Sequence, residues 1–354
     1  MIRFEQVTKR YGRHDAPALA ELDLTLCTGE LTVLVGPSGC GKTTTLRLIN
    51  RLEEASAGRI IIDDMPIDDL DVIDLRRGIG YVMQHSGLFP HRTVAENIAV
   101  VPRLLGWKRA RIRARVDELI TLVGLDTGLA GRYPHQLSGG QQQRVGVARA
   151  LAADPPILLM DEPFAAVDPI VRTRLQDELR SLQARLQKTI VFVTHDIDEA
   201  IRLGDRIAIF AEGGRLAQYA PPTDVLAAPA DDFVADFLGA DRDLKRLALF
   251  SAADASAMSP SPVADPGTTD IRAIAQAAGV NWVFWRDADG APSGWQYLDE
   301  TAPQAVGTVI GPADSLRKAL GAILQSPLGA VPRVDAQGRL DGVLDRAALA
   351  AVLA

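Results

Sequence analysis

The segment GPSGCGKT at residues 36–43 constrains the fold more than any other part of the chain, because it matches the pattern GxxxxGK[ST] and directly follows the apolar run LTVLV. That order predicts a buried strand, a glycine turn and a helix whose first N–H groups converge on an anion. Lys42 would add a positive charge beside the outer phosphates of a nucleotide, and the Thr43 hydroxyl would hold Mg²⁺. The sequence therefore predicts a site for a nucleoside triphosphate, built from Gly36, Pro37, Ser38, Gly39, Cys40, Gly41, Lys42, Thr43 and Thr44.

The composition narrows the class of protein. A length of 354 residues is enough for two or three domains, each with its own core. The 38 basic and 45 acidic residues give a net charge of −7, which argues against nucleic acid as a partner because phosphate-backbone binding needs clustered positive charge. We expect a cytosolic chain, since no apolar run reaches the roughly 18 residues that span a bilayer and the N-terminus lacks a signal-peptide core. Two cysteines are too few for a disulfide framework.

Residues 1 to about 240 alternate apolar runs with amphipathic stretches, which is the pattern of a parallel α/β sheet. The runs ILLMD at 157–161 and TIVFVTH at 189–195 are short enough to be strands buried on both faces. A mainly helical insertion is expected at about 90–150, where apolar residues repeat at helical spacing. The same spacing predicts a crossover helix after Asp168 that buries Ile170 or Val171, Leu175, Leu179, Leu182 and Leu186.

The composition changes at about residue 241, where a small, Pro-rich linker leads into a tail with a faint repeat. The motif DADG at 287–290, followed by Gly294, is echoed 48 positions later by DAQG at 335–338, followed by Gly342. Two copies of one small α/β module would explain this echo. We therefore expect one domain at residues 1–240, with the helical insertion inside it, and a second at 241–354.

Three titratable residues follow or end predicted strands. Asp161 ends the run ILLM, Glu162 comes next, and His195 ends the following strand. Because the carboxyl ends of parallel strands meet at one edge of a sheet, these side chains should lie beside the glycine turn. Asp161 could then hold Mg²⁺, Glu162 could polarise an attacking water, and His195 could contact the γ-phosphate. The alternative for the two carboxylates is an exposed pair that caps a helix.

A second anion-binding pattern occurs about 100 residues after the first. The segment LSGGQQQR at 137–144 opens a helix with a serine and two glycines, and so offers a hydroxyl and backbone N–H groups. Ser138 could be no more than a helix cap. Since the first loop already holds the phosphates of its own nucleotide, we expect the second pattern to serve the nucleotide of another subunit.

These motifs, in this order, resemble the ATP-binding cassette (ABC) family over residues 1 to about 240. Tyr11 falls where the family stacks an aromatic ring on adenine, and Gln84 matches the glutamine that senses the γ-phosphate and Mg²⁺. The resemblance implies catalytic roles for Glu162, His195 and Gln84, and a metal site of Thr43, Gln84 and Asp161. It also implies a homodimer that holds two ATP molecules, each in contact with the other copy through Ser138, Gly139, Gly140, Gln141 and the loop of Asp168.

The resemblance is closer still to the ATPase subunits of quaternary-amine, or osmoprotectant, importers, which move glycine betaine, proline betaine, choline or carnitine. The stretches that carry it are INRLEE (49–54), GLFPHRTVAENI (87–98), VPRLLGW (101–107) and DDFVADFLGADRDLKRL (231–247). Such a chain works at the cytoplasmic face of the membrane with transmembrane permease subunits and, indirectly, an extracytoplasmic substrate-binding protein. The implied fold is α/β, with a P-loop ABC ATPase domain, its helical subdomain and a C-terminal CBS-like α/β pair.

Other interpretations stay open at this point. The chain could serve an importer for another small solute, such as methionine or ergothioneine, or be a soluble ABC ATPase without a membrane partner. The tail could act only in dimerisation. Trp282, Trp285, Trp295 and Tyr297 could form an aromatic cage for a quaternary ammonium, although aromatic residues at this spacing more often belong to a core.

Overall fold

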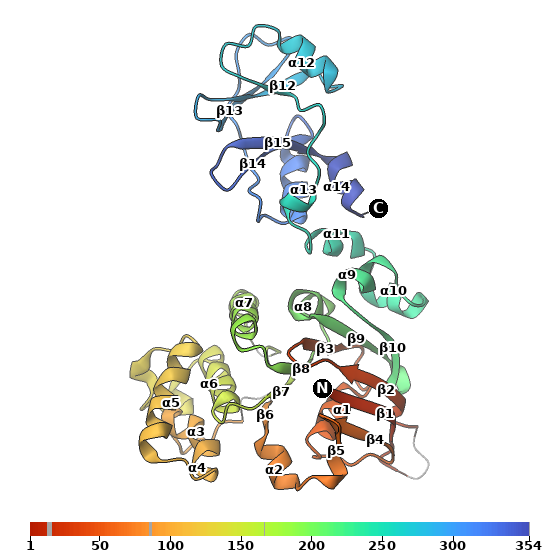
Figure 1. Cartoon of the computed structure of the whole chain (residues 1–354), viewed down its shortest axis with the longest axis vertical. Helices are drawn as coiled ribbons and strands as arrows, with labels where there is room; N and C mark the ends of the chain where they lie inside the picture. Colours follow the sequence, from red (N-terminus) through yellow and green to blue (C-terminus); the bar gives the residue numbers. More distant parts are fainter. Residues whose placement is uncertain (13–15, 85–86, 166, 354) are drawn as a thin grey trace. The chain divides into compact units, whose positions relative to one another are not determined.

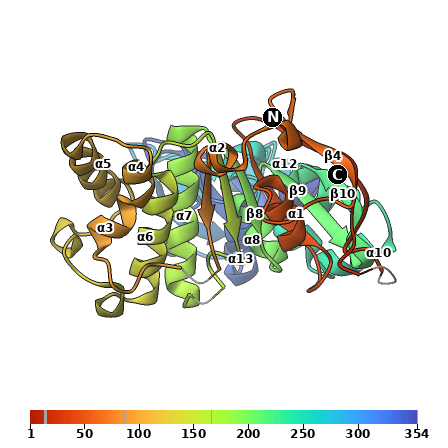
Figure 2. The same ribbon diagram turned by 90° about the horizontal axis from the view of Figure 1, so that it is seen from below.

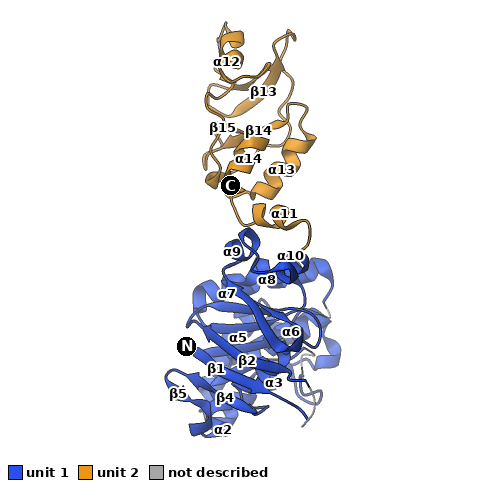
Figure 3. Cartoon of the chain, turned by 90° about the vertical axis from the view of Figure 1, so that its right-hand side faces the viewer, with its two compact units in different colours: residues 1–238 blue, residues 239–354 orange. Residues whose placement is uncertain are grey.

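The computed structural model describes residues 1–12, 16–84, 87–165 and 167–353. The chain divides into two compact units, Met1–Leu238 (unit 1) and Gly239–Ala354 (unit 2), which Figure 3 colours separately. In the described part of the chain, no helix combines the length and the apolar character needed to cross a membrane.

The main sheet of unit 1 has the strand order β10-β9-β3-β8-β7-β6. Its strands run parallel except β10, which is antiparallel to β9. Every residue of β3, β7 and β8 is buried, which agrees with the unbroken apolar runs in the sequence. The strands are β3 (Leu31–Val35), β6 (Ile79–Val82), β7 (Ile157–Asp161), β8 (Thr189–Val193), β9 (Arg206–Ala211) and β10 (Arg215–Ala220).

A second, antiparallel sheet packs against the first. Its strand order is β2-β1-β4-β5, and a single apolar cluster that includes Phe4, Leu26, Leu34 and Phe210 joins the two sheets. This shared core fixes β3, and with it the glycine turn that follows β3. The strands of the second sheet are β1 (Ile2–Lys9), β2 (Leu19–Leu26), β4 (Ala57–Ile62) and β5 (Met65–Pro66).

Where the sequence predicts a helical insertion, residues 94–151 form four α-helices, two short 3-10 helices and no strand. Figures 1 and 2 both show α3 to α6 gathered at one side of unit 1, where α6 contacts β6. The insertion contains α3 (Val94–Ile98), α4 (Val100–Leu104), α5 (Arg109–Leu122) and α6 (Gly139–Leu151). The other helices of unit 1 are α1 (Lys42–Ile49), α2 (Val72–Arg77), α7 (Pro169–Leu186), α8 (Ile197–Leu203), α9 (Pro222–Ala227) and α10 (Asp232–Leu238).

The crossover helix α7 begins directly after Asp168, as predicted, but the predicted apolar stripe is wrong at its first turn. Ile170 is 84% exposed and Val171 is 40% exposed, whereas Leu175, Leu179 and Leu182 are buried. The buried positions of α7 therefore begin at Leu175, and the apolar side chains of its first turn remain at the surface.

Unit 2 holds two small sheets with helices packed on them. One sheet has the order β11-β12-β13, and the other pairs β14 with β15. Its strands are β11 (Val263–Ala264), β12 (Trp282–Arg286), β13 (Pro292–Tyr297), β14 (Ala330–Val334) and β15 (Leu340–Asp345), and its helices are α11 (Arg242–Leu247), α12 (Ile271–Ala277), α13 (Leu316–Gln325) and α14 (Arg346–Leu353). Short 3-10 helices in the two units are η1 (Ile67–Asp69), η2 (Thr127–Leu129), η3 (Pro134–Gln136), η4 (Glu212–Gly214) and η5 (Ala252–Asp254).

The two hairpins of unit 2 have the same pairing register, offset by the 48 residues of the sequence repeat. Trp285 pairs with Gly294 in the first hairpin, and Arg333 pairs with Gly342 in the second. The two turns match as well, because the carboxylates of Asp287 and Asp335 each accept backbone N–H groups two and four residues later in the chain. The two DAxG motifs thus occupy equivalent turns.

Candidate nucleotide site

The loop between β3 and α1 is shaped by glycines at its two ends. Gly36 has a φ of 151°, and a Cβ atom there would lie 2.2 Å from the carbonyl oxygen of Phe210. Gly41 has a φ of 94°, and its Cβ would lie 2.3 Å from the carbonyl oxygen of Ala18. Both positions therefore need glycine for space as well as for backbone conformation. The two ends of the loop therefore pack closely against Phe210 in β9 and against Ala18, the residue before β2.

Lys42 lies inside this loop. Its ammonium group donates hydrogen bonds of 2.7 Å to the carbonyl oxygens of Gly36 and Pro37, and its side chain is buried. The Cys40 sulfur is 3.6 Å from the same ammonium, and burial raises the pKa of the Cys40 thiol. The predicted phosphate loop thus holds one positive charge at its centre and a thiol that stays protonated.

Asp161 faces Thr43 from the end of β7. The Thr43 hydroxyl donates a 3.0 Å hydrogen bond to Asp161 Oδ1, so two residues 118 positions apart in sequence meet as the sheet order requires. Burial raises the pKa of the Asp161 carboxyl. Tyr81 was missed in the sequence analysis: its hydroxyl lies 3.5 Å from Asp161 Oδ2, and burial together with Asp161 raises the pKa of Tyr81 to about 12. In the sequence, the signal that could have pointed to Tyr81 was its polar ring within the otherwise apolar run IGYV (79–82).

Glu162 gathers the other two predicted catalytic residues around its carboxylate. Gln84 Nε2 donates a 3.1 Å hydrogen bond to Glu162 Oε2, and His195 Nδ1 lies 3.3 Å from Glu162 Oε1. The backbone of Glu162 has a φ of 43°, a left-handed conformation that costs a non-glycine residue about 1–2 kcal/mol. Its N–H nevertheless continues the sheet by donating to the Val193 carbonyl oxygen at 3.0 Å. The turn after β7 is therefore held to β8 at Glu162, the residue whose carboxylate contacts Gln84 and His195.

A small cavity of 30 Å³ lies behind Glu162 and His195. That volume holds about one or two water molecules. Arg172 and Glu199 also line it, and neither was singled out from the sequence. Glu199 is buried, accepts a 2.9 Å hydrogen bond from Gln176 Nε2, and has its pKa raised by burial. In the sequence, the signal that could have pointed to Glu199 was its position soon after His195, on the first turn of the next helix, α8.

Tyr11 lies at the exposed rim of the loop, as an adenine-stacking ring would. The ring is 58% exposed, and its hydroxyl is 3.2 Å from the Thr44 hydroxyl. The ammonium of Lys9 lies 4.9 Å from the ring centroid. One face of the ring can therefore meet a flat ligand beside the helix that follows the phosphate loop.

Ser138 caps its own helix. Its hydroxyl accepts the N–H of Gln141, and the Gln141 side chain accepts the N–H of Ser138, which together form a capping box ahead of Gly139 and Gly140. Among the described residues, no hydrogen bond joins Ser138, Gly139, Gly140 or Gln141 to the phosphate loop at residues 36–44. Figures 1 and 2 both show α6 beside α5, apart from α1. Within one chain, the structure therefore brings together Thr43, Gln84, Asp161, Glu162 and His195. It leaves Ser138, Gly139, Gly140 and Gln141 apart from them.

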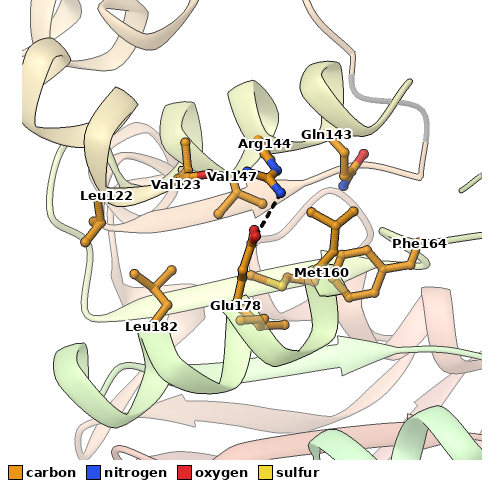
Figure 4. Close-up of a pocket in the computed structure, with 11 residues that line it drawn as sticks. Leu122, Val123, Gln143, Arg144, Val147, Met160, Phe164, Glu178 and Leu182 are labelled. Carbon is orange, nitrogen blue, oxygen red and sulfur yellow. Dashed lines mark hydrogen bonds and ion pairs between the residues drawn. The ribbon is translucent and has the colours of Figure 1, made fainter. Parts of the chain in front are cut away.

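Asp168 caps α7 in the same way, since its carboxylate accepts the N–H of Ile170 at 2.9 Å. The first turns of α6 and α7 lie side by side: a Cβ at Gly140 would be 3.3 Å from Val171 Cγ1. Further along, Arg144 joins the two helices through a 2.8 Å bond to Glu178, across a pocket of 40 Å³ that Figure 4 shows. The helix N-termini that Ser138 and Asp168 cap are thus neighbours in the structure.

The comparisons with known proteins all find ATP-binding proteins of the ABC type. A family model described as ABC transporter matches residues 19–165. The osmoprotectant import ATP-binding protein OsmV of Salmonella typhimurium is 46% identical over 98% of this chain and 94% of its own length. The glycine betaine/carnitine/choline transport ATP-binding protein OpuCA of Bacillus subtilis is 42% identical over 99% of this chain and 95% of its own. A dimeric ATP-binding cassette in a post-hydrolysis state with ADP and Pi matches with a TM-score of 0.56 and 36% identity, over 63% of this chain and 99% of that one.

Proposed function

Because this chain belongs to the ABC transporter family, as an ATP-binding subunit and ATPase of the osmoprotectant-importer type, we propose that it powers the uptake of a quaternary amine such as glycine betaine, choline, carnitine or proline betaine. The observation that carries the ATPase chemistry is the meeting of Asp161 and Glu162 with Thr43, Gln84 and His195. The solute class is supported by relatives that match along the whole chain, tail included.

In the proposed reaction, Glu162 acts as the general base. Its carboxylate would take a proton from the water that attacks the γ-phosphate, while Gln84 and His195 hold that carboxylate in place. Lys42 would pair with the β- and γ-phosphates, and His195 would meet the γ-phosphate from the next strand end. Tyr11 would stack on adenine.

The donor set at the end of β7 fits Mg²⁺. The Thr43 hydroxyl and the Asp161 carboxylate lie 3.0 Å apart, and the Gln84 amide is held nearby through Glu162, so hard oxygen atoms dominate the site. Bound there, Mg²⁺ would neutralise charge that develops on the phosphates. The protein would contribute Thr43, Asp161 and Gln84 as ligands.

The proposed active form is a homodimer. Among the described residues, no hydrogen bond joins Ser138, Gly139, Gly140 or Gln141 to the phosphate loop of the same chain, and a second copy would bring them to the nucleotide. The exposed Ile170 beside the Asp168 cap supports a contact with that copy. ATP binding would close the dimer, and hydrolysis with release of phosphate would reopen it.

The proposed partners are transmembrane permease subunits, which would hold the chain at the cytoplasmic face of the membrane, and indirectly a substrate-binding protein. We assign residues 1–240 to the ABC cassette, with its helical subdomain at about 90–150, and residues 241–354 to a CBS-like regulatory pair. The matching registers of the two hairpins support a pair of related modules. The rival interpretation is an importer for methionine or ergothioneine.

Uptake by cells that co-express the chain with its permease tests the proposal. Labelled glycine betaine, choline, carnitine and methionine would be compared at low and high salt, with Glu162→Gln as the inactive control. We expect uptake of quaternary amines that the mutant abolishes. Uptake of methionine alone would leave the ATPase assignment intact and overturn the solute class.

A further inference from the structure

The wall of the small cavity behind Glu162 and His195 includes an arginine that has no part in the proposed reaction. Arg172 lines this cavity from the first turn of α7, and its side chain is 30% exposed. Its Nε is buried and has no hydrogen-bond partner in the described part of the chain. Leaving a buried N–H unpaired costs stability, so packing alone does not account for an arginine here. Its other side-chain nitrogen atoms contact two separate segments, the loop that leads into α7 and the turn that follows β8.

In the loop that leads into α7, Arg172 contacts two backbone carbonyl groups. Its Nη2 donates a 3.1 Å hydrogen bond to the carbonyl oxygen of Val167. Its backbone N–H donates a 2.7 Å hydrogen bond to the carbonyl oxygen of Asp168, the residue that caps the helix. Arg172 thus binds both of the residues that directly precede α7.

In the turn that follows β8, Arg172 faces a carboxylate. Its Nη1 lies 4.0 Å from Oδ2 of Asp196, the residue directly after His195. The other carboxylate oxygen of Asp196 accepts the N–H groups of Asp198 and Glu199 at 2.8 and 3.3 Å, which fixes this side chain at the start of α8. The positive charge of Arg172 therefore lies beside a carboxylate that is held by α8 and is next to His195 in the chain.

A second polar contact joins the same two helices one turn further along α7. There, the buried side chain of Gln176 donates a 2.9 Å hydrogen bond to the buried carboxyl of Glu199 on α8. This contact holds the two helices together but does not reach the loop before α7. Of the two contacts, the one through Arg172 also binds the loop that contains Asp168.

We propose that Arg172 is a positioning residue for ATP hydrolysis, which ties the turn of His195 to the loop of Asp168 and so keeps His195 against Glu162. The inference rests on the roles in hydrolysis that the proposed function gives to His195 and Glu162. Among the described residues, no hydrogen bond or ion pair joins Arg172 to the phosphate loop at residues 36–44. ATP should therefore bind normally when Arg172 is replaced, and only the hydrolysis of bound ATP should become slower.

Steady-state ATP hydrolysis by the full chain tests this inference. Arg172→Gln should lower kcat by about three- to tenfold, a modest loss because the ion pair is partly exposed, and should leave KM for ATP within about twofold of the wild type. Arg172→Lys keeps the positive charge and should recover part of the lost rate. Arg174→Gln is the matched control, since Arg174 lies on the same helix, is 75% exposed and pairs with Glu178 at 3.2 Å. Its loss should leave kcat and KM unchanged.

A double-mutant cycle shows whether Arg172 acts through His195. His195→Ala should lower kcat, and adding Arg172→Gln should then cause no further loss, because the side chain to be positioned is already absent.

Three results would overturn the inference alone: a wild-type kcat in Arg172→Gln, a loss confined to KM, or the same factor of loss with and without His195. A wild-type kcat in His195→Ala would overturn the proposed role of His195 and the inference together. None of these rates depends on the imported solute, so the uptake experiment tests the solute class separately.

Discussion

In unit 1, charged side chains stand at the ends of buried strands and act on one another directly, whereas a cavity of 360 Å³ in unit 2 is lined without charged side chains among the described residues. Asp161 and Glu162 follow β7, and their partners Thr43, Gln84 and His195 come from neighbouring parts of the same sheet edge. The cavity around Trp295 is instead made of rings, small apolar residues and a helix end. The first arrangement suits a polyanion with Mg²⁺, whereas the second offers no charged side chain to a ligand.

The two sites also differ in how much space they leave for a larger side chain. Around the phosphate loop, a single added carbon at Gly36 or Gly41 would meet backbone atoms closer than 2.5 Å. In unit 2, Gln325 and the loop at 304–308 are largely exposed, so the cavity can adjust at its rim. Rigid placement of charge serves catalysis, because donors that need no reorganisation stabilise a transition state best.

The largest effect is expected on ATP hydrolysis, from substitution of the proposed general base Glu162. Glu162→Gln keeps the size of the side chain but cannot accept a proton, so ATP hydrolysis should fall by about 10²- to 10⁴-fold. ATP binding should persist, and the variant should accumulate as a closed dimer. Phosphate release, nucleotide binding and size-exclusion chromatography with ATP would measure the three properties.

Asp177→Asn is the matched control for that substitution. Asp177 lies on α7 and pairs with Arg202 at 2.7 Å, away from Glu162. Its loss should leave hydrolysis near the wild-type rate. Equal turnover by the wild type and Glu162→Gln would show that another group is the base, and the contrast between a charged and an uncharged site would lose its main support.

The next effect compares two glycines of the same loop. A Cβ at Gly41 would lie 2.3 Å from a backbone oxygen, whereas a Cβ at Gly39 would meet no atom within 4 Å, although both residues have positive φ. Gly41→Ala should therefore lower the free energy of unfolding by more than about 3 kcal/mol, and Gly39→Ala by about 1 kcal/mol. Urea denaturation of both variants would check this, and equal losses would mean that the loop shifts to make room.

The two sites also differ in how far the sequence could predict them. The strand that ends at Asp161 and the glycine turn were predictable because each motif is local and its physical role follows from strand and helix ends. Tyr81, Arg172 and Glu199 were not, because they reach the site from elements whose packing is set by tertiary contacts. In unit 2 the register of the repeat was visible, but Trp295 and Gln325 line one cavity from different elements, and no short motif connects them.

A smaller effect is expected from Tyr11, the exposed aromatic ring beside the phosphate loop. Loss of the stacking ring in Tyr11→Ala should weaken ATP binding by about tenfold, since base stacking contributes about 1–3 kcal/mol. Tyr11→Phe loses the contact with the Thr44 hydroxyl but keeps the ring, so its affinity should stay near that of the wild type. Fluorescent-nucleotide titration would measure both, and an unchanged affinity in Tyr11→Ala would remove the stacking role.

The smallest effect concerns Glu199, a carboxyl buried in unit 1 that lines the small cavity shared with Glu162 and His195. Burial is the main cause that raises its pKa, so between the ordinary pKa and the raised one the folded chain binds a proton that the unfolded chain does not. Stability from this group is therefore present at low pH and is lost as the pH rises through that window. Glu199→Gln should be more stable than the wild type at neutral pH, and the difference should vanish as the pH falls below the ordinary pKa of glutamate. Denaturation at several pH values, with the exposed Asp177→Asn as control, would reveal this; a variant less stable at neutral pH would mean that the ionised carboxylate is fully satisfied where it lies.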